Sequence, residues 1–227
     1  SWERELSAFG LPVEGRVLLP AVGFIFDMRS ARKRFSSDEI LKFAVANVAD
    51  EVMRRDGAEA VCFPYSARLW FSLHSFRPTL SVNGYEETRR RLRRFRDALQ
   101  RALKLPMSFQ LGGMCASFGA LKQEMAKLLA AETQRFYMAQ GEIAAARALP
   151  PPESELFAHY LETIDTFRDR VMKGDVRGVK TEVEAWVSFL RDRRYDPEAV
   201  KDWALKLLLD LRLRHQSARQ FRSFRSA

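Results

Sequence analysis

The chain has 227 residues, 47% of them hydrophobic and 30% charged, which fits one large or two small globular domains and excludes disorder over its whole length. Two cysteines, Cys62 and Cys115, exclude a disulfide-stapled secreted fold and indicate free thiols in a reducing compartment. The net charge of +9 points to a polyanion or an acidic partner surface. No apolar run reaches the roughly 20 residues that span a membrane, and we expect a cytoplasmic protein without a membrane partner.

Strands and helices alternate in the first part of the chain. The unbroken apolar run over residues 16–27 predicts a buried central strand, with Pro20 at its start or at a bulge. A capping box at residues 36–39 opens a helix, and an antiparallel hairpin surrounds Pro64-Tyr65-Ser66. The other elements expected here are hairpin strands over 59–63 and 68–76, an arginine-rich helix from Asn83-Gly84 to Pro106, a strand over 107–118 and a helix from Leu121 to Gly141.

Pro150-Pro151-Pro152 marks a domain boundary. We therefore expect an α+β domain over residues 1–149, a sheet containing antiparallel strands with helices packed on it, and an all-α bundle over residues 150–227. Three helices are predicted in the bundle, over about 153–173, 175–193 and 196–211, with a frayed helix or tail after them. Their predicted inward positions are Leu156, Tyr160, Ile164, Phe167, Val171, Val179, Val183, Trp186, Leu190, Val200, Ala204, Leu207, Leu208 and Leu211.

The sequence offers no catalytic, cofactor-binding or metal-binding motif. His74, His159 and His215 fall in different elements and lack a Cys or His neighbour at ligand spacing. Asp27 follows the first strand, where enzymes often place a carboxylate, but it lacks a second carboxylate two residues away, and a turn or helix cap is the favoured interpretation. Phosphate-binding glycine loops are absent, and the Trp186 and Trp203 pair is interpreted as core packing. We therefore expect no enzyme activity and no cofactor.

Basic side chains gather on the helix after Asn83. On one interpretation they contact nucleic-acid phosphates without sequence preference; on the other they pair with nearby acids such as Glu86 and Glu87 on a solvated face. The six candidate phosphate contacts are Arg89, Arg90, Arg93, Arg94, Arg96 and Arg101. A second basic stretch covers residues 212–225.

The element order resembles the GGDEF-type nucleotide cyclase fold. In that family the first hairpin carries glycines and carboxylates that hold phosphate and metal, whereas this hairpin reads Phe63-Pro64-Tyr65-Ser66-Ala67-Arg68-Leu69, and only Asp27 can match the family's metal carboxylate. The segments Phe43-Ala44-Val45-Ala46-Asn47-Val48-Ala49-Asp50-Glu51 and Gln134-Arg135-Phe136-Tyr137-Met138-Ala139-Gln140-Gly141-Glu142 are similar to the degenerate GGDEF-like middle domains of bacterial AraC-type regulators.

This resemblance implies a non-catalytic signal-transduction domain within a longer protein, a two-component response regulator that acts in transcription regulation. Its implied partners are a receiver domain and a DNA-binding helix-turn-helix pair of the same full-length protein, with a homodimer as a further candidate. DNA would be bound only through the full-length protein. The alternatives are a small-ligand sensor domain and an unrecognised hydrolase.

Overall fold

In a computed structural model of the chain, described over residues 6, 10–54, 59–78, 83–146 and 151–225, the residues form two compact units. The first unit comprises residues 1–132 and 138–147, and the second comprises residues 133–137 and 148–227. The predicted boundary between residues 149 and 150 lies outside the described residues. Among the described helices, none combines the length and apolar composition needed to cross a membrane.

The first unit is built on a five-stranded sheet in the order β2-β3-β1-β4-β5. β1 is central and pairs antiparallel with β3 and with β4, β2 pairs antiparallel with β3, and β5 adds to β4 in parallel. The strands are β1 (Val17–Ile25), β2 (Ala60–Pro64), β3 (Leu69–Phe76), β4 (Met107–Leu111) and β5 (Ile143–Ala145). The predicted α+β class and the antiparallel hairpin are confirmed.

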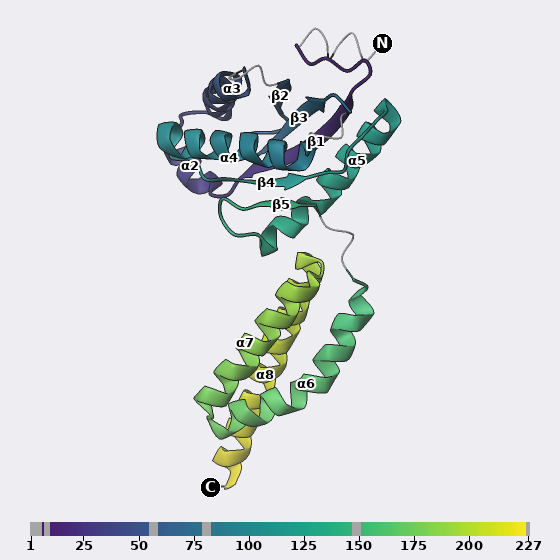
Figure 1. Cartoon of the computed structure of the whole chain (residues 1–227). Coiled ribbons are helices and arrows are strands. Elements are labelled where there is room, and N and C mark those ends of the chain that lie inside the picture. The colour runs from purple at the N-terminus through teal and green to yellow at the C-terminus, as the bar shows by residue number, and fades with distance from the viewer. Residues whose placement is uncertain (1–5, 7–9, 55–58, 79–82, 147–150, 226–227) are drawn as a thin grey trace. The chain divides into compact units, whose positions relative to one another are not determined.

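Helices cover both faces of this sheet (Figure 1). Because side chains alternate along a strand, Leu19 and Ala21 of β1 face the core shared with α3 and α4, whereas Val22 faces α5. The helical elements are α2 (Met28–Arg34), α3 (Asp38–Arg54), α4 (Gly84–Leu103), α5 (Phe118–Ala130) and a 3₁₀ helix, η2 (Ala131–Tyr137).

Three local features differ from the sequence predictions. The short helix α2 was not anticipated. The strand expected over residues 107–118 ends at Leu111 and resumes only as an isolated bridge between Leu18 and Cys115. Pro20 lies inside β1, opposite Leu73. Its carbonyl accepts from Gly112 N–H, just beyond the last β4 residue, so its missing N–H falls where that ladder has ended.

Gly23 of β1 sits under an aromatic ring. A Cβ at this position would lie 2.5 Å from Phe109 Cε1 and 2.9 Å from Met107 Cε, and both neighbours are fully buried. We expect Gly23→Ala to destabilise the first unit by about 1–3 kcal/mol, because a packed core resists an added methyl group.

The matched control is Gly119→Ala in α5, where an added Cβ meets nothing within 4 Å. This change should stabilise the unit by roughly 0.5–1 kcal/mol, because alanine loses less conformational freedom in a helix. Urea unfolding of both variants measures the difference. Equal effects of the two substitutions would show that the Gly23 site can accommodate a side chain.

The second unit contains three helices, α6 (Glu153–Lys173), α7 (Val176–Arg193) and α8 (Pro197–Arg225). Gly174 ends α6 in a left-handed conformation with φ of 70°, and Asp175 caps α7 through Gly178 N–H. The core centres on Leu156, Tyr195 and Val200. Trp186 and Trp203 pack around this core and donate their indole N–H groups to Thr163 and Glu153, so the structure places both tryptophans in core packing.

The bundle leaves several predicted inward positions uncovered. Val183 is 45% exposed and Leu208 is 63% exposed, and Ala204 is also exposed. Val183 and Ala204 nevertheless line the apolar cavity of the bundle, so their inward direction is confirmed, whereas the prediction for Leu208 was wrong. Of the two alternatives expected after residue 211, a frayed helix or a tail, the structure has a helix, since α8 continues to Arg225.

Candidate functional site

The turn of the β2–β3 hairpin is closed by its own hydrogen bonds. Tyr65 and Ser66 donate their backbone N–H groups to Leu69 O at 2.9 and 3.0 Å. Ser66 Oγ accepts from the N–H groups of Arg68 and Leu69 at 3.2 and 3.0 Å. Four backbone donors of the turn are therefore engaged within it, whereas a phosphate-binding loop directs such donors at its ligand.

Asp27 caps a helix. Its carboxylate accepts from the Ser30 hydroxyl at 2.5 Å and from the Ser30 backbone N–H at 3.0 Å, at the first turn of α2. These two hydrogen bonds lower the pKa of the Asp27 carboxyl from its ordinary value, the side-chain bond contributing most. The structure thus confirms the helix cap, one of the two roles that the sequence favoured for Asp27.

The histidines and cysteines are spread over both units. His74 is fully buried in β3, and His159 of α6 stacks on Phe189 with ring centroids 3.7 Å apart. Cys62 and Cys115 are free thiols, and burial raises the pKa of Cys62 to about 12. Within the described part of the chain, no three His, Cys, Asp or Glu side chains lie close enough to hold a metal ion.

Acidic or carbonyl partners lie next to the α4 arginines Arg89, Arg90 and Arg96. Arg89 pairs with Glu86 at 3.5 Å and Arg90 pairs with Glu87 at 2.7 Å, as the solvated-face interpretation predicts. Arg96 donates to Gly141 O and to Asp97, both at 2.9 Å. These contacts reduce the charge that α4 offers to an external anion, without removing access to the exposed guanidinium edges.

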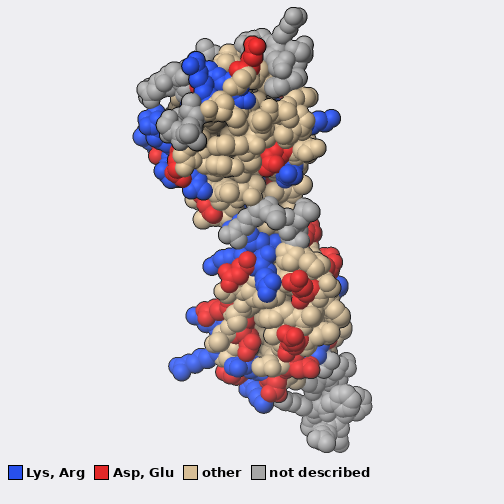
Figure 2. All heavy atoms as spheres, turned by 45° about the vertical axis from the view of Figure 1, so that its right-hand side comes forward, with Lys and Arg blue, Asp and Glu red and all other residues tan. Residues whose placement is uncertain are grey.

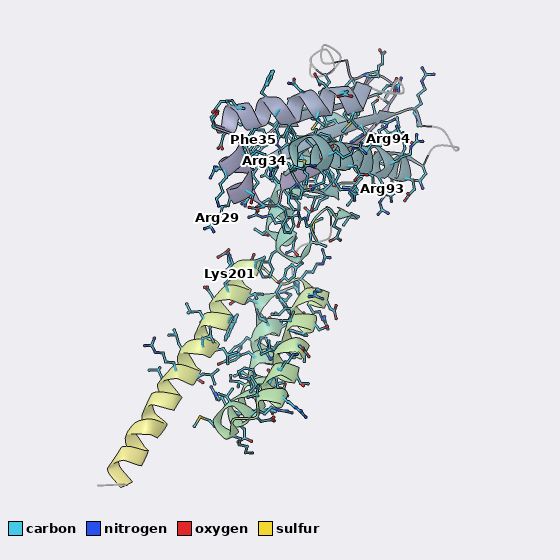
Figure 3. All side chains as sticks on the ribbon, turned by 90° about the vertical axis from the view of Figure 1, so that its left-hand side faces the viewer. Arg29, Arg34, Phe35, Arg93, Arg94 and Lys201 are labelled. Carbon is cyan, nitrogen blue, oxygen red and sulfur yellow. The ribbon has the colours of Figure 1, made fainter. Side chains whose placement is uncertain are left out.

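The remaining candidates, Arg93, Arg94 and Arg101, are exposed. Figure 3 labels Arg93 and Arg94 on α4, and Arg34 of α2 donates to Leu103 O at the last residue of the same helix. Basic and acidic side chains adjoin one another on the face drawn in Figure 2. The arginines that the sequence grouped together thus differ in their surroundings, since Arg89, Arg90 and Arg96 contact nearby acids or a carbonyl group.

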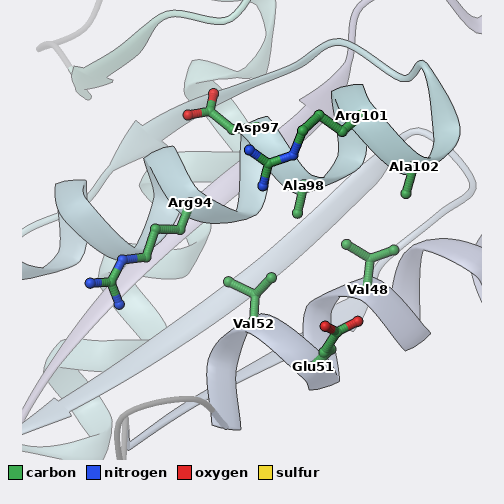
Figure 4. Close-up of a pocket in the computed structure, with 8 residues that line it drawn as sticks. All are labelled: Val48, Glu51, Val52, Arg94, Asp97, Ala98, Arg101 and Ala102. Atoms are coloured by element: carbon green, nitrogen blue, oxygen red, sulfur yellow. The ribbon is translucent and has the colours of Figure 1, made fainter.

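A groove runs between α3 and α4 with a volume of about 630 Å³. Figure 4 shows Val48 and Val52 of α3 facing Ala98 and Ala102 of α4 across it. Its four charged lining residues are Glu51, Arg94, Asp97 and Arg101. Two cations and two anions sum to zero formal charge, so the groove suits a ligand with both polar and apolar parts better than a polyanion.

The sequence did not predict that α3 and α4 form the two walls of a groove. The signal that could have found it is the recurrence of small or short apolar residues four positions apart on each helix, Val48 with Val52 and Ala98 with Ala102. Short side chains at facing positions leave space between two packed helices. The closing role of Ser66 was also missed, although a serine in a turn often bonds nearby backbone N–H groups.

No protein-family model matches this sequence, and no curated protein matches it significantly. Among solved structures, the chain is similar to the GGDEF domain of DgcB from Caulobacter crescentus in complex with c-di-GMP. The two share 13% identity with a TM-score of 0.39, and the match covers 65% of this chain and 86% of that one. At 13% identity, no residue role passes from that domain to this chain.

Proposed function

We propose that this chain is a non-catalytic relay module of a bacterial two-component transcription regulator of the AraC type. It would couple a receiver domain to a pair of helix-turn-helix motifs in the same protein. The closed turn at Pro64-Tyr65-Ser66 carries the non-catalytic part of the proposal. It occupies the hairpin where the cyclase family that the sequence resembles has glycines and carboxylates, and its backbone donors are already engaged.

Phosphoryl transfer depends on positioned metal ions and phosphate donors. Asp27, the one match to the family's metal carboxylate, is instead engaged by Ser30. The test is incubation of the chain with GTP and Mg²⁺ or Mn²⁺, followed by chromatography of the nucleotides. We expect no turnover above a control without protein, and the same background for Asp27→Asn. Turnover by the wild-type chain above that control would overturn the non-catalytic assignment.

The relay part is tested in the full-length protein. Replacing this chain by a flexible Gly/Ser linker should leave basal promoter binding in place but remove the change in affinity that follows receiver phosphorylation. Fluorescence anisotropy with a promoter duplex measures both. A regulator that still responds to phosphorylation through the linker does not use this chain as a relay. Flanking sequences that encode neither a receiver nor helix-turn-helix motifs would also refute the proposal.

The isolated chain is expected to bind DNA weakly and without sequence preference. Arg93, Arg94 and Arg101 are exposed, whereas Arg89 and Arg90 are paired with acids. We expect a dissociation constant of about 10⁻⁴ M or higher, and an affinity that decreases as the salt concentration rises. Sequence preference should be absent because contacts to phosphate carry no sequence information. Anisotropy with an unrelated and a promoter duplex, at low and moderate salt, measures this. Submicromolar binding that distinguishes the duplexes would contradict it.

The α3–α4 groove favours a small-ligand sensor as a second candidate function. Its volume of about 630 Å³ lies within the range of roughly 300–1,000 Å³ found for small-molecule sites. Thermal-shift screening against nucleotides and other metabolites that carry both charged and apolar groups tests it. A ligand-induced stabilisation that Ala98→Trp removes, by filling the groove, would favour the sensor over the relay.

A further inference from the structure

Helix α8 carries more apolar surface than its own unit covers. On one side, Val200 and Trp203 pack in the bundle core, and Leu207 lines a small cavity with Phe167 of α6. On the other side four leucines remain about half exposed or more: Leu205, Leu208, Leu209 and Leu213. An apolar face of a helix is normally covered by a packed partner, and this second apolar face of α8 is left exposed within the unit.

The uncovered face contains a regular seam. Asp202, Leu205, Leu209 and Arg212 follow one another at spacings of three, four and three residues, the a and d positions of a heptad. Residues at these positions lie along one line of a helix and meet the equivalent line of a partner helix. At a rise of about 1.5 Å per residue, the seam is roughly 15 Å long.

The two ends of the seam carry charges of opposite sign, and neither charge has an ion-pair partner among the described residues. The neighbouring charged groups have partners: Lys201 pairs with Glu198 at 2.6 Å, Asp210 with Arg168 at 2.7 Å, and Lys206 lies over the Trp203 ring. By contrast, Asp202 and Arg212 form no ion pair or hydrogen bond with any residue that the structure describes.

We propose that this seam, Asp202-Leu205-Leu209-Arg212, binds the same seam of a second copy of the chain, with the two α8 helices antiparallel about a two-fold axis. In this arrangement Asp202 lies opposite Arg212 of the other copy, and Leu205 lies opposite Leu209. Because the arrangement is self-complementary, both contacts occur twice. A parallel arrangement would instead set Asp202 against Asp202 and Arg212 against Arg212, at a cost in repulsion.

The seam itself offers two leucine layers and two ion pairs, so the interface is small. Interfaces below about 1,200 Å² belong to weak or transient complexes. We therefore expect a reversible dimer with a dissociation constant on the order of 10–100 μM. This inference goes beyond the relay function and does not depend on it, because it rests only on the residues of α8.

The experiment is sedimentation equilibrium of the 227-residue chain across concentrations from micromolar to about 0.5 mM. Asp202→Arg and Arg212→Asp should each weaken the dimer at least tenfold, because each sets like charges opposite one another twice. The double variant Asp202→Arg/Arg212→Asp restores opposite charges and should return to within about threefold of wild type. All of these positions are exposed, and circular dichroism checks that the helices remain folded.

The matched control is Asp192→Arg, the same change of charge at an exposed position of α7 outside the seam, which should leave the dimer constant unchanged. A wild-type chain that stays monomeric at the highest concentration would overturn the proposal. So would single variants that dimerise as well as wild type. Failure of the double variant to recover would exclude the antiparallel register, even if the chain dimerises.

Discussion

Replacing Phe95 by alanine is expected to destabilise the first unit by about 3–5 kcal/mol. The Phe95 side chain is fully buried between α4 and the sheet, with its ring centroid 5.9 Å from that of Phe109. Removing the ring takes away its buried apolar surface and leaves a cavity, because the backbones of α4 and β4 hold the surrounding side chains apart.

The matched control is Phe43→Ala. Phe43 lies on α3 and is 68% exposed, so its loss should change stability by no more than about 0.5 kcal/mol. Urea unfolding followed by circular dichroism measures both variants. A Phe95→Ala chain that loses less than about 1 kcal/mol would show that the sheet and α4 close over the cavity, a much softer packing than this core has.

The parts of the fold that local pattern determines were predictable from the sequence. Leu92, Phe95 and Leu99 recur at helical spacing and are all buried, because helical spacing alone places these residues on one face. The ion pairs of Arg89 and Arg90 follow the same logic, since residues three apart on a helix are neighbours.

The end of β4 was not predictable, because a distant residue sets it. The apolar pattern continues past Leu111, yet Gly113 N–H donates to Glu124 Oε1 of α5 at 2.8 Å instead of continuing the ladder. A side chain at Gly112 would lie 2.9 Å from Glu124 Cγ, so the chain passes close to α5 here. Sequence spacing carries no information about this contact between elements.

The different partners of the α4 arginines and the exposed face of α8 were not predictable for the same reason. Both depend on contacts between elements that are far apart in the sequence. Arg96 donates to Gly141 O at 2.9 Å, 45 residues away in sequence, so local pattern could not distinguish it from the other candidate arginines. In α8, apolar residues between Ala204 and Leu213 occupy every side of the helix except the one that carries Lys206 and Asp210. Periodicity therefore could not indicate which side packs on α6 and α7, and Leu208 was assigned inward although it is exposed.

The second large effect is a loss of stability of the first unit as the pH falls from about 6.5 towards 3. His74 is fully buried in β3, where Nε2 lies 3.1 Å from Ser72 Oγ and Nδ1 has no hydrogen-bond partner among the described residues. Burial, and secondarily the positive charge of Arg91, lower the pKa of His74 to about 3. Folding therefore keeps this imidazole neutral.

The direction of this change in stability follows from proton uptake by the unfolded chain. In the unfolded chain His74 binds a proton as the pH falls through about 6.5, whereas the folded chain does not until about pH 3. Between these values the unfolded state holds more protons, so the free energy of unfolding decreases as the pH falls, and above pH 6.5 the contribution of His74 is constant. The total loss is on the order of 5 kcal/mol, at roughly 1.4 kcal/mol per pH unit.

His74→Leu removes the titrating group and should flatten the pH dependence between pH 6.5 and 5, where most carboxylates remain ionised. Urea unfolding of the first unit at half-unit pH steps measures the slope for both chains. His159→Leu is the control, because His159 lies in the second unit and burial lowers its pKa as well; it should leave the slope of the first unit unchanged. If His74→Leu and the wild-type chain lose stability at the same rate over this interval, the imidazole titrates freely in the folded state and β3 admits water at His74.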